Sequence, residues 1–264
     1  MVTKIIELEK PKLKNPVFVE GLPGIGNVGR IAAGYLVEEL KAKKFAELFS
    51  SHFMPFVLLQ ENSSVHVLKN EFYYWKAKEK NQRDLIILIG DSQSIDPEGH
   101  YEIVESILDF IQKFGVKEIF ALAGLSIGEE KEKPNVVGAV NDPELIKKYE
   151  KYGIDFQSVN KVGTIVGASG LFIGLGKLRG IKGVCLLGET PGFPIIPDPK
   201  GAEAILNVLT KILNLKIDIS RLERKVKEME ELIKKVEDAQ RRTLGQLLAP
   251  PEKTGKKEEL TYIG

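Results

Sequence analysis

Apolar residues follow two different patterns along this chain: continuous runs, typical of buried strands, and a spacing of three and four, typical of helices. Residues Leu85–Ile89 are all apolar and are followed by Gly90 and Asp91, which predicts a strand buried on both faces. From Asn27 to Leu40 the apolar residues recur at spacings of three and four, which predicts an amphipathic helix. Because such segments alternate, we predict an α/β fold, a three-layer sandwich whose central sheet is mostly parallel.

The remaining elements of the predicted fold follow from the same patterns. Residues 4–9 and 17–19 are predicted to be two short strands around a turn, and Asp96–Gly99 opens a helix. Further strands are predicted at 45–50, 56–60, 64–68, 71–75, 117–123, 136–141, 155–159 and 181–187, and further helices at 143–151, 171–179 and 202–213.

The last fifty residues have a different pattern. From Leu215 to Val236 apolar residues alternate at spacings of four and three, which is the heptad pattern of a coiled coil. We predict that residues 215–242 form a helix that joins more than two copies of the chain, because Leu232 and Ala239 widen the apolar stripe. The alternative is a helix that packs on its own domain. The predicted contact residues are Ile219, Leu222, Val226, Met229, Ile233 and Val236.

Residues 243–264 are predicted to be a flexible tail. Pro250 and Pro251 precede a charged run at 252–259 that cannot build a core, and an aromatic tip follows at 260–264. The chain therefore divides into an α/β core domain of residues 1–214, the heptad helix and this tail.

Composition limits the classes of partner. The chain has 264 residues with 38 Lys or Arg and 37 Asp or Glu, so its formal net charge is +1. This balance makes nucleic acid and acidic membrane surfaces poor default partners. Cys185 is the only cysteine, which excludes an intramolecular disulfide and a cysteine-rich zinc site. The start of the chain lacks a signal-like stretch and no apolar run is long enough to cross a bilayer, so we expect a cytoplasmic protein.

A glycine-rich segment follows the second predicted strand. Gly24, Gly26 and Gly29 fit the pattern G-x-G-x-x-G, and with Asn27 they lie where a helix begins, a place suited to a pyrophosphate. A dinucleotide site also needs an acid at the end of the next strand, which here ends in residues 49–52 without one. Two interpretations stay open: a ligand loop, or a tight turn that packs a helix closely against the sheet.

A second motif, G-x-S-x-G, spans Gly124 to Gly128 around Ser126. The histidines all precede this serine, whereas the hydrolase order places the histidine after it, so we expect no serine hydrolase. No histidine pair is spaced for a metal platform, and we expect no metal site and no cofactor. The carboxylates near strand ends are left as open candidates: Asp84, Asp91, Asp96 and Glu189.

Three segments together resemble the archaeal proteasome assembly chaperone family. They are residues 20–29, 167–171 and 186–192, and the resemblance covers roughly residues 15–215. It implies a three-layer α/β fold similar to nucleoside phosphorylases, without an established catalytic site. It also implies oligomerisation and binding to the α-subunit ring of the proteasome core particle, as an assembly factor or activator.

The resemblance extends in part to the end of the chain. Some members end in a hydrophobic residue, a tyrosine and any residue, and this tail enters pockets between neighbouring α subunits. Here Tyr262 stands third from the end and Thr261 occupies the hydrophobic position, so the tip is shifted by one residue. The residues expected to bind the partner are Leu260, Tyr262, Ile263 and Gly264.

Two functions from different classes follow. The first is a non-enzymatic, homo-oligomeric chaperone or adaptor that binds the proteasome α ring or an associated protein. The second is a protein that binds or converts a nucleotide or nucleoside, using the Gly24–Gly29 loop and the strand ends near Asp91 and Glu189, since sheets of this class hold ligands beyond the carboxyl ends of their strands.

Overall fold

The computed structural model describes residues 2–158, 163–192, 197–222, 224, 234–235, 238–239 and 241–242. Within this part of the chain, nine strands form one sheet in the order β1-β3-β6-β7-β2-β8-β11-β9-β10. Its strands are β1 Thr3–Glu7, β2 Val17–Gly21, β3 Lys43–Ser50, β6 Asn70–Trp75, β7 Leu85–Gly90, β8 Glu118–Ser126, β9 Val136–Val140, β10 Ile154–Asp155 and β11 Lys182–Thr190. The helices are α1 Val28–Glu39, α2 Pro97–Gln112, α3 Glu144–Tyr149, α5 Ala168–Leu178 and α6 Pro199–Leu213, with short 3-10 turns at Ile25–Asn27, Glu150–Tyr152 and Ile219–Arg221.

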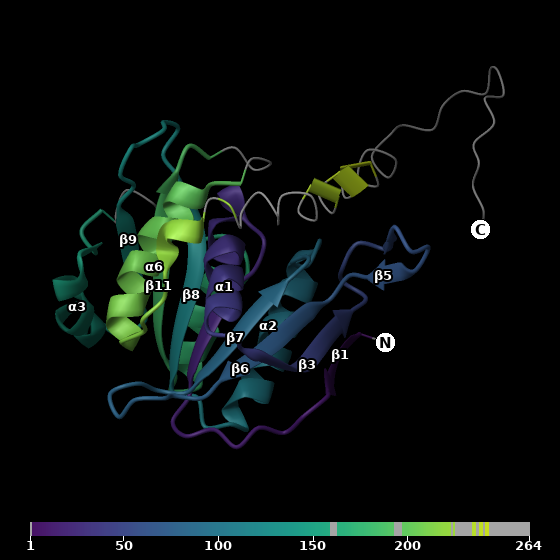
Figure 1. The fold of residues 1–264 in the computed structure, drawn as a ribbon, viewed down its shortest axis with the longest axis horizontal. Helices are drawn as coiled ribbons and strands as arrows, with labels where there is room; N and C mark the ends of the chain where they lie inside the picture. The colour runs from purple at the N-terminus through teal and green to yellow at the C-terminus, as the bar shows by residue number, and fades with distance from the viewer. Residues whose placement is uncertain are drawn as a thin grey trace.

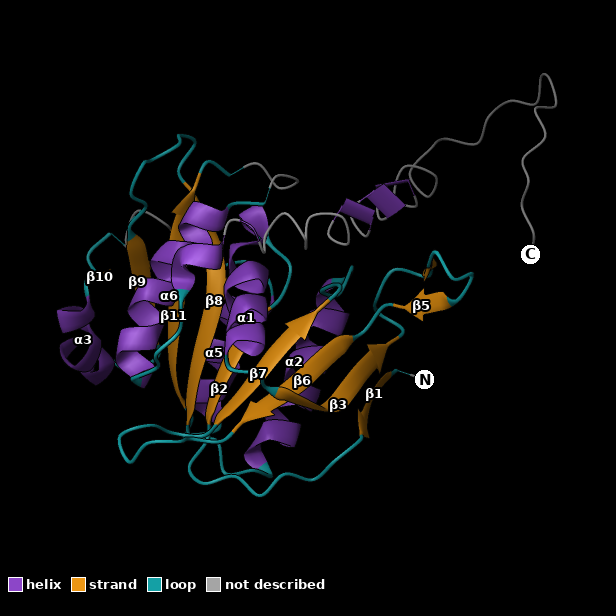
Figure 2. Cartoon of the chain, viewed as in Figure 1, coloured by secondary structure: helices purple, strands orange, loops and turns teal. Residues whose placement is uncertain are grey.

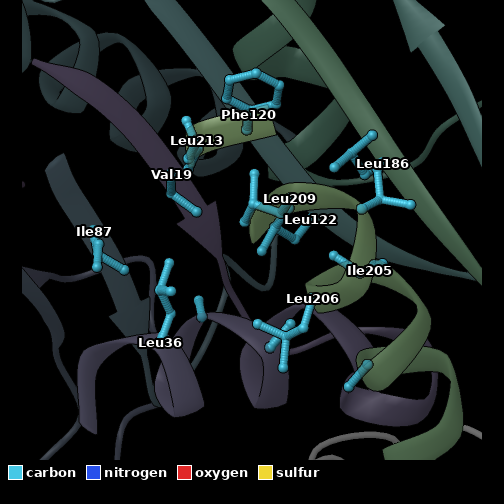
Figure 3. Close-up of a cluster of buried hydrophobic side chains, with 14 of the residues drawn as sticks. Val19, Leu36, Ile87, Phe120, Leu122, Leu186, Ile205, Leu206, Leu209 and Leu213 are labelled. Atoms are coloured by element: carbon cyan, nitrogen blue, oxygen red, sulfur yellow. The ribbon is translucent and has the colours of Figure 1, made fainter. Parts of the chain in front are cut away.

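Helices cover the sheet on both faces, as the three-layer prediction requires (Figures 1 and 2). On the central strand β2, Val19 belongs to the core under α1 and α6, whereas its neighbour Phe18 belongs to the core under α2 and α5. This alternation follows from the two-residue period of a strand. Figure 3 shows the first core, to which Leu36 of α1, Leu206 of α6 and Leu122 of β8 all belong.

The sheet is mixed, so the prediction of a mostly parallel sheet is right only for its centre. Strands β7, β2, β8 and β11 are parallel to one another. On one side β6, β3 and β1 continue the sheet with antiparallel contacts, and on the other side β9 is antiparallel to β11. The segment between β6 and β7 holds no helix, and parallel neighbours need a long crossover, so the direct connection gives antiparallel pairing.

The two predicted N-terminal strands exist but do not pair with each other. Strand β1 pairs antiparallel with β3, whereas β2 lies between β7 and β8. Their burial explains the separation. Every residue of β2 is buried, as suits the centre of a sheet, while β1 is largely exposed, as suits an edge.

A separate two-stranded ribbon consists of β4 Val57–Leu59 and β5 Val65–Val67. It is antiparallel, with Val57 opposite Val67 and Leu59 opposite Val65. Figure 1 shows it on the side of the molecule that holds β3 and β1. None of the helices in the described ranges is long and apolar enough to span a membrane.

The first predicted heptad positions lie against this chain's own core. Leu222 is 2% exposed and belongs to the core under α1 and α6, and Ile219 packs against it. Just before them, the hydroxyl of Tyr35 on α1 donates a hydrogen bond to the carbonyl oxygen of Asp218. Ala239, at the far end of the predicted helix, packs partly buried against the other core. Val226, Met229, Ile233, Val236 and the tail residues Leu260, Tyr262, Ile263 and Gly264 lie outside the described residues.

Candidate functional site

The three segments that carry the family resemblance meet at the carboxyl ends of the parallel strands. The hydroxyl of Ser169, in the first turn of α5, donates to Glu20 Oε2 on β2 over 2.9 Å. The backbone N–H of Asp198, which precedes α6, donates to the carbonyl oxygen of Gly26 over 2.8 Å. A Cβ at Gly26 would come within 2.9 Å of Thr190 Oγ1 at the end of β11. Segments distant in the sequence therefore form one packed edge of the sheet.

The glycines of the G-x-G-x-x-G segment make close contacts with the protein's own backbone. A Cβ at Gly29 would lie 2.0 Å from the carbonyl oxygen of Leu122 on β8, so α1 begins directly against that strand. Gly26 has a φ of 60°, in the left-handed region that favours glycine. The next residue, Asn27, is 2% exposed with a φ of 49°. These contacts support the packing interpretation of the loop over the ligand interpretation. Gly24 has room around it, with the Gln93 amide nitrogen 3.9 Å from where its Cβ would be.

Glu20 is a buried acidic residue at this edge that sequence analysis did not single out. It is fully buried on β2 and accepts hydrogen bonds from the Leu22 backbone N–H and the Ser169 hydroxyl, both at 2.9 Å. Burial raises the pKa of its carboxyl to about 7, against the opposing effect of these two hydrogen bonds. The available signal was an acidic residue inside an otherwise apolar strand.

Gln93 completes the connection between β2 and α5. Its Oε1 accepts from the Ala168 backbone N–H over 2.9 Å, at the start of α5, and its Nε2 donates to the carbonyl oxygen of Pro23 over 2.6 Å. Cys185 of β11 is fully buried nearby, and burial together with the Glu20 charge raises the pKa of its thiol. A buried cysteine held as a thiol is unreactive. The cluster thus positions α5 on the sheet and has no solvent-facing carboxylate.

Glu189 at the end of β11 binds two residues of the charged loop that follows β8. Lys131 Nζ donates to Glu189 Oε1 at 2.9 Å and to Oε2 at 3.0 Å, and the Asn135 backbone N–H donates to Oε2 at 2.8 Å. Burial would raise the pKa of this carboxyl, but the Asn135 N–H and the Lys131 ammonium hold it below its usual value. Its partners give Glu189 a structural role.

The other carboxylates proposed near strand ends, Asp84, Asp91 and Asp96, each have partners of their own. Asp91 Oδ2 lies 2.6 Å from His66 Nε2, and Asp96 Oδ2 lies 2.8 Å from His52 Nδ1. Asp84 accepts hydrogen bonds from the Lys14 and Ala77 backbone N–H groups. Among the described residues no group of three metal-ligating side chains is assembled.

The G-x-S-x-G motif does not form a nucleophile elbow. Ser126 is the last residue of β8, and the chain continues into the loop tied down by Glu189 instead of a helix. A Cβ at Gly192 would lie 1.8 Å from Ser126 Oγ, so the hydroxyl packs against the β11–α6 connection. His52 and His66 bind carboxylates, and His100 Nδ1 lies 2.9 Å from the carbonyl oxygen of Asp96.

A cavity of about 430 Å³ opens at the same edge of the sheet. Four of its charged side chains form two ion pairs: Lys131 with Glu189, and Lys200 with Glu130 at 2.7 Å. Asp198 caps the start of α6 by accepting from the Lys200 and Gly201 N–H groups. The lining residues are Ile127, Gly128, Glu129, Glu130, Lys131, Pro134, Glu189, Thr190, Pro191, Pro197, Asp198, Pro199 and Lys200.

Comparison with known proteins gives the family. Residues 18–237 match the model of the PAC2 family. The chain belongs to the PAC2 family. An uncharacterized protein of Methanocaldococcus jannaschii is 36% identical over 264 residues, covering 100% of this chain and 98% of that protein. The resemblance inferred from the three sequence segments is confirmed.

Solved structures of PAC2-like proteins share the fold. The structure of Pyrococcus furiosus PbaB, an archaeal proteasome activator, has a TM-score of 0.81 at 47% identity and covers 89% of this chain and 99% of that chain. Pyrococcus furiosus PbaA, an archaeal homolog of proteasome-assembly chaperone, has a TM-score of 0.71 at 29% identity, covering 90% of this chain and 99% of that chain.

Proposed function

We propose that this chain is a non-enzymatic, homo-oligomeric chaperone or adaptor that binds the α-subunit ring of the proteasome core particle or a protein associated with it. The observation that carries the proposal is the 47% identity to PbaB, a proteasome activator, over 89% of this chain. The likeness to PbaA, a homolog of proteasome-assembly chaperone, supports the same class of partner.

The side chains that could act in catalysis have structural partners, which supports a binding role. Glu189 holds the loop after β8, and His66 and Asp91 hold the ribbon to the sheet. Glu20 is buried with Ser169. The family resemblance also implies no established catalytic site.

The tail residues Leu260, Tyr262, Ile263 and Gly264 are proposed to contact the α ring. A tyrosine ring supplies a large contact area at low entropic cost, and a terminal carboxylate suits capture by a lysine or by backbone amides. The tether before them, about 15 residues, reaches roughly 20 Å as a flexible coil and at most about 50 Å when extended.

Self-association would present several tails at once. We propose that Val226, Met229, Ile233 and Val236 gather more than two chains into a coiled coil, whereas the predicted contacts Ile219 and Leu222 pack in this chain's own core at its base. Linked tails then bind with avidity even where each one binds weakly. The coiled coil and the likeness to nucleoside phosphorylases stay predictions, and we place the protein in the cytoplasm.

Binding to purified archaeal proteasome core particles tests the proposal. The full chain and a Lys257→Ala control are expected to bind, whereas Tyr262→Ala and a chain ending at Pro250 are expected to bind at least about tenfold more weakly. Equal binding by all four proteins would exclude the tail. Binding by none of the four proteins would contradict the proposal that the proteasome core particle is the partner.

Nucleotide or nucleoside binding by the Gly24–Gly29 loop remains the alternative from the sequence. The cavity at the carboxyl edge lies where sheets of this class hold ligands. Its lining comes from the β8 and β11 ends, however, and Gly26 and Gly29 face the protein's own atoms. Calorimetric titration with a panel of nucleotides and nucleosides tests this alternative. The absence of a binding signal for every compound would exclude it.

A further inference from the structure

The β4–β5 ribbon presents four aliphatic side chains to solvent. Leu59 is 76% exposed, Val65 59%, Val67 49% and Val57 45%. Val57 lies opposite Val67, and Leu59 lies opposite Val65. Residues two apart on a strand and directly opposite across an antiparallel pair share one face, so these four side chains form a single aliphatic patch.

The opposite face of the ribbon fixes its orientation. Leu58 is 9% exposed and belongs to the core under α2 and α5. His66, opposite Leu58, places its Nε2 2.6 Å from Asp91 Oδ2 at the end of β7. The inner face is therefore held to the sheet, and the aliphatic patch must face away from it.

The ribbon segment that carries the patch has proportionally fewer charged residues than the chain as a whole. Between residues 56 and 68 only Glu61 is acidic or basic apart from His66, although 28% of all residues are charged. A surface that contacts its own copy across a two-fold axis meets the same set of side chains on the partner, so a patch carrying charges of one sign would repel its copy. An uncharged aliphatic patch meets this condition.

We infer that the outer face of the β4–β5 ribbon is a contact surface for a second copy of this chain, ribbon packed on ribbon. Faces of branched aliphatic side chains pack well between two sheets about 10 Å apart. A contiguous apolar patch on the surface of a folded protein often marks an interaction site, whereas apolar residues that are exposed singly do not.

The patch is too small to hold two copies together by itself. A stable dimer buries about 800 Å² on each partner, more than four aliphatic side chains supply. The ribbon contact therefore adds to a larger contact, the heptad segment, which holds the copies at high effective concentration. The inference rests on the self-association proposed above.

Native mass across a dilution series tests the inference with the full chain. Leu59→Lys places a charge in the patch, and Leu178→Lys is the matched control, because Leu178 is 82% exposed at the end of α5. We expect half-dissociation of Leu59→Lys at a protein concentration at least about tenfold higher than for the wild type, and unchanged dissociation of Leu178→Lys.

The outcomes separate the two proposals. An oligomer whose dissociation is the same in Leu59→Lys and the wild type overturns the ribbon contact and leaves self-association standing. A wild-type chain that is monomeric at every concentration overturns both. If Leu59→Lys keeps its mass but loses proteasome binding, the patch belongs to another partner and the inference is wrong.

Crosslinking gives an independent readout. Cys185 is fully buried, so Leu59→Cys would carry one accessible thiol. Two facing sheets lie about 10 Å apart, whereas the Cα atoms of a disulfide are at most about 6.8 Å apart. A short bis-maleimide is therefore used to link the two thiols. Crosslinked dimers are expected for Leu59→Cys and not for Leu178→Cys. Equal yields from the two variants would overturn the inference.

Discussion

The Ser169 hydroxyl donates a 2.9 Å hydrogen bond to the carboxyl of Glu20 inside a core where Glu20 has no exposed surface. This bond joins the central strand β2 to the first turn of α5. The two residues are 149 positions apart, and each belongs to a segment that carries the family resemblance. In this chain, two of the segments that carry the resemblance are therefore joined by an internal contact between strand and helix.

Glu20→Gln is expected to change how stability depends on pH. The unfolded chain loses the Glu20 proton near the ordinary pKa of 4.5, whereas the folded chain keeps it up to about 7. Between these values the folded state binds more protons, so this group lowers wild-type stability as pH rises. At about 1.4 kcal/mol per pKa unit, the glutamine variant should gain about 3 kcal/mol over the wild type across this range.

Urea unfolding at fixed protein concentration between pH 4.5 and 7.5 measures this difference. The exposed Glu61→Gln serves as the control and should show a constant difference from the wild type. A Glu20→Gln difference that does not change with pH would contradict the assignment of the raised pKa to Glu20.

Two glycine-to-alanine changes in helices are expected to act in opposite directions. Gly29→Ala puts a Cβ 2.0 Å from the Leu122 carbonyl oxygen, so α1 must move off β8 and stability should fall by about 2 kcal/mol or more. Gly174→Ala in α5 meets open space and should stabilise by about 0.5–1 kcal/mol, because alanine favours the helix. Thermal unfolding compares them, and a tolerated Gly29→Ala would favour the ligand interpretation of the loop.

Leu222→Ala is expected to destabilise the core domain itself. The side chain is 2% exposed among core residues of α1 and α6, and deleting a buried leucine costs about 2–5 kcal/mol. Leu178→Ala, at a position 82% exposed, should change stability by less than about 0.5 kcal/mol. Denaturant unfolding distinguishes them. Equal stability of both variants would mean that Leu222 serves only contacts between chains.

The order and type of the elements could be predicted from local patterns. The apolar run at Leu85–Ile89 is the core of β7, and the helix opened at Asp96–Gly99 is α2, capped by the Asp96 side chain on the Gly99 N–H. What local patterns lack is the choice of strand partners. The pairing of β1 with β3 and the antiparallel outer strands depend on contacts between distant segments.

The candidate site was predictable in position but not in role. The pattern at Gly24–Gly29 marks a strand-to-helix turn, which the structure confirms. Its role depends on Leu122, about ninety residues later, whose carbonyl leaves no room for a Cβ at Gly29. In the same way, the heptad pattern identifies Leu222 as apolar but does not distinguish a neighbouring chain from this chain's own α1 and α6.

The central claim, binding to the proteasome α ring, is tested most directly by single-particle electron microscopy of core particles mixed with the full chain. We predict additional density on the end faces of the cylinder, formed by the α rings, and its loss when the chain ends at Pro250. Bare end faces at saturating concentrations of the full chain would contradict the claim.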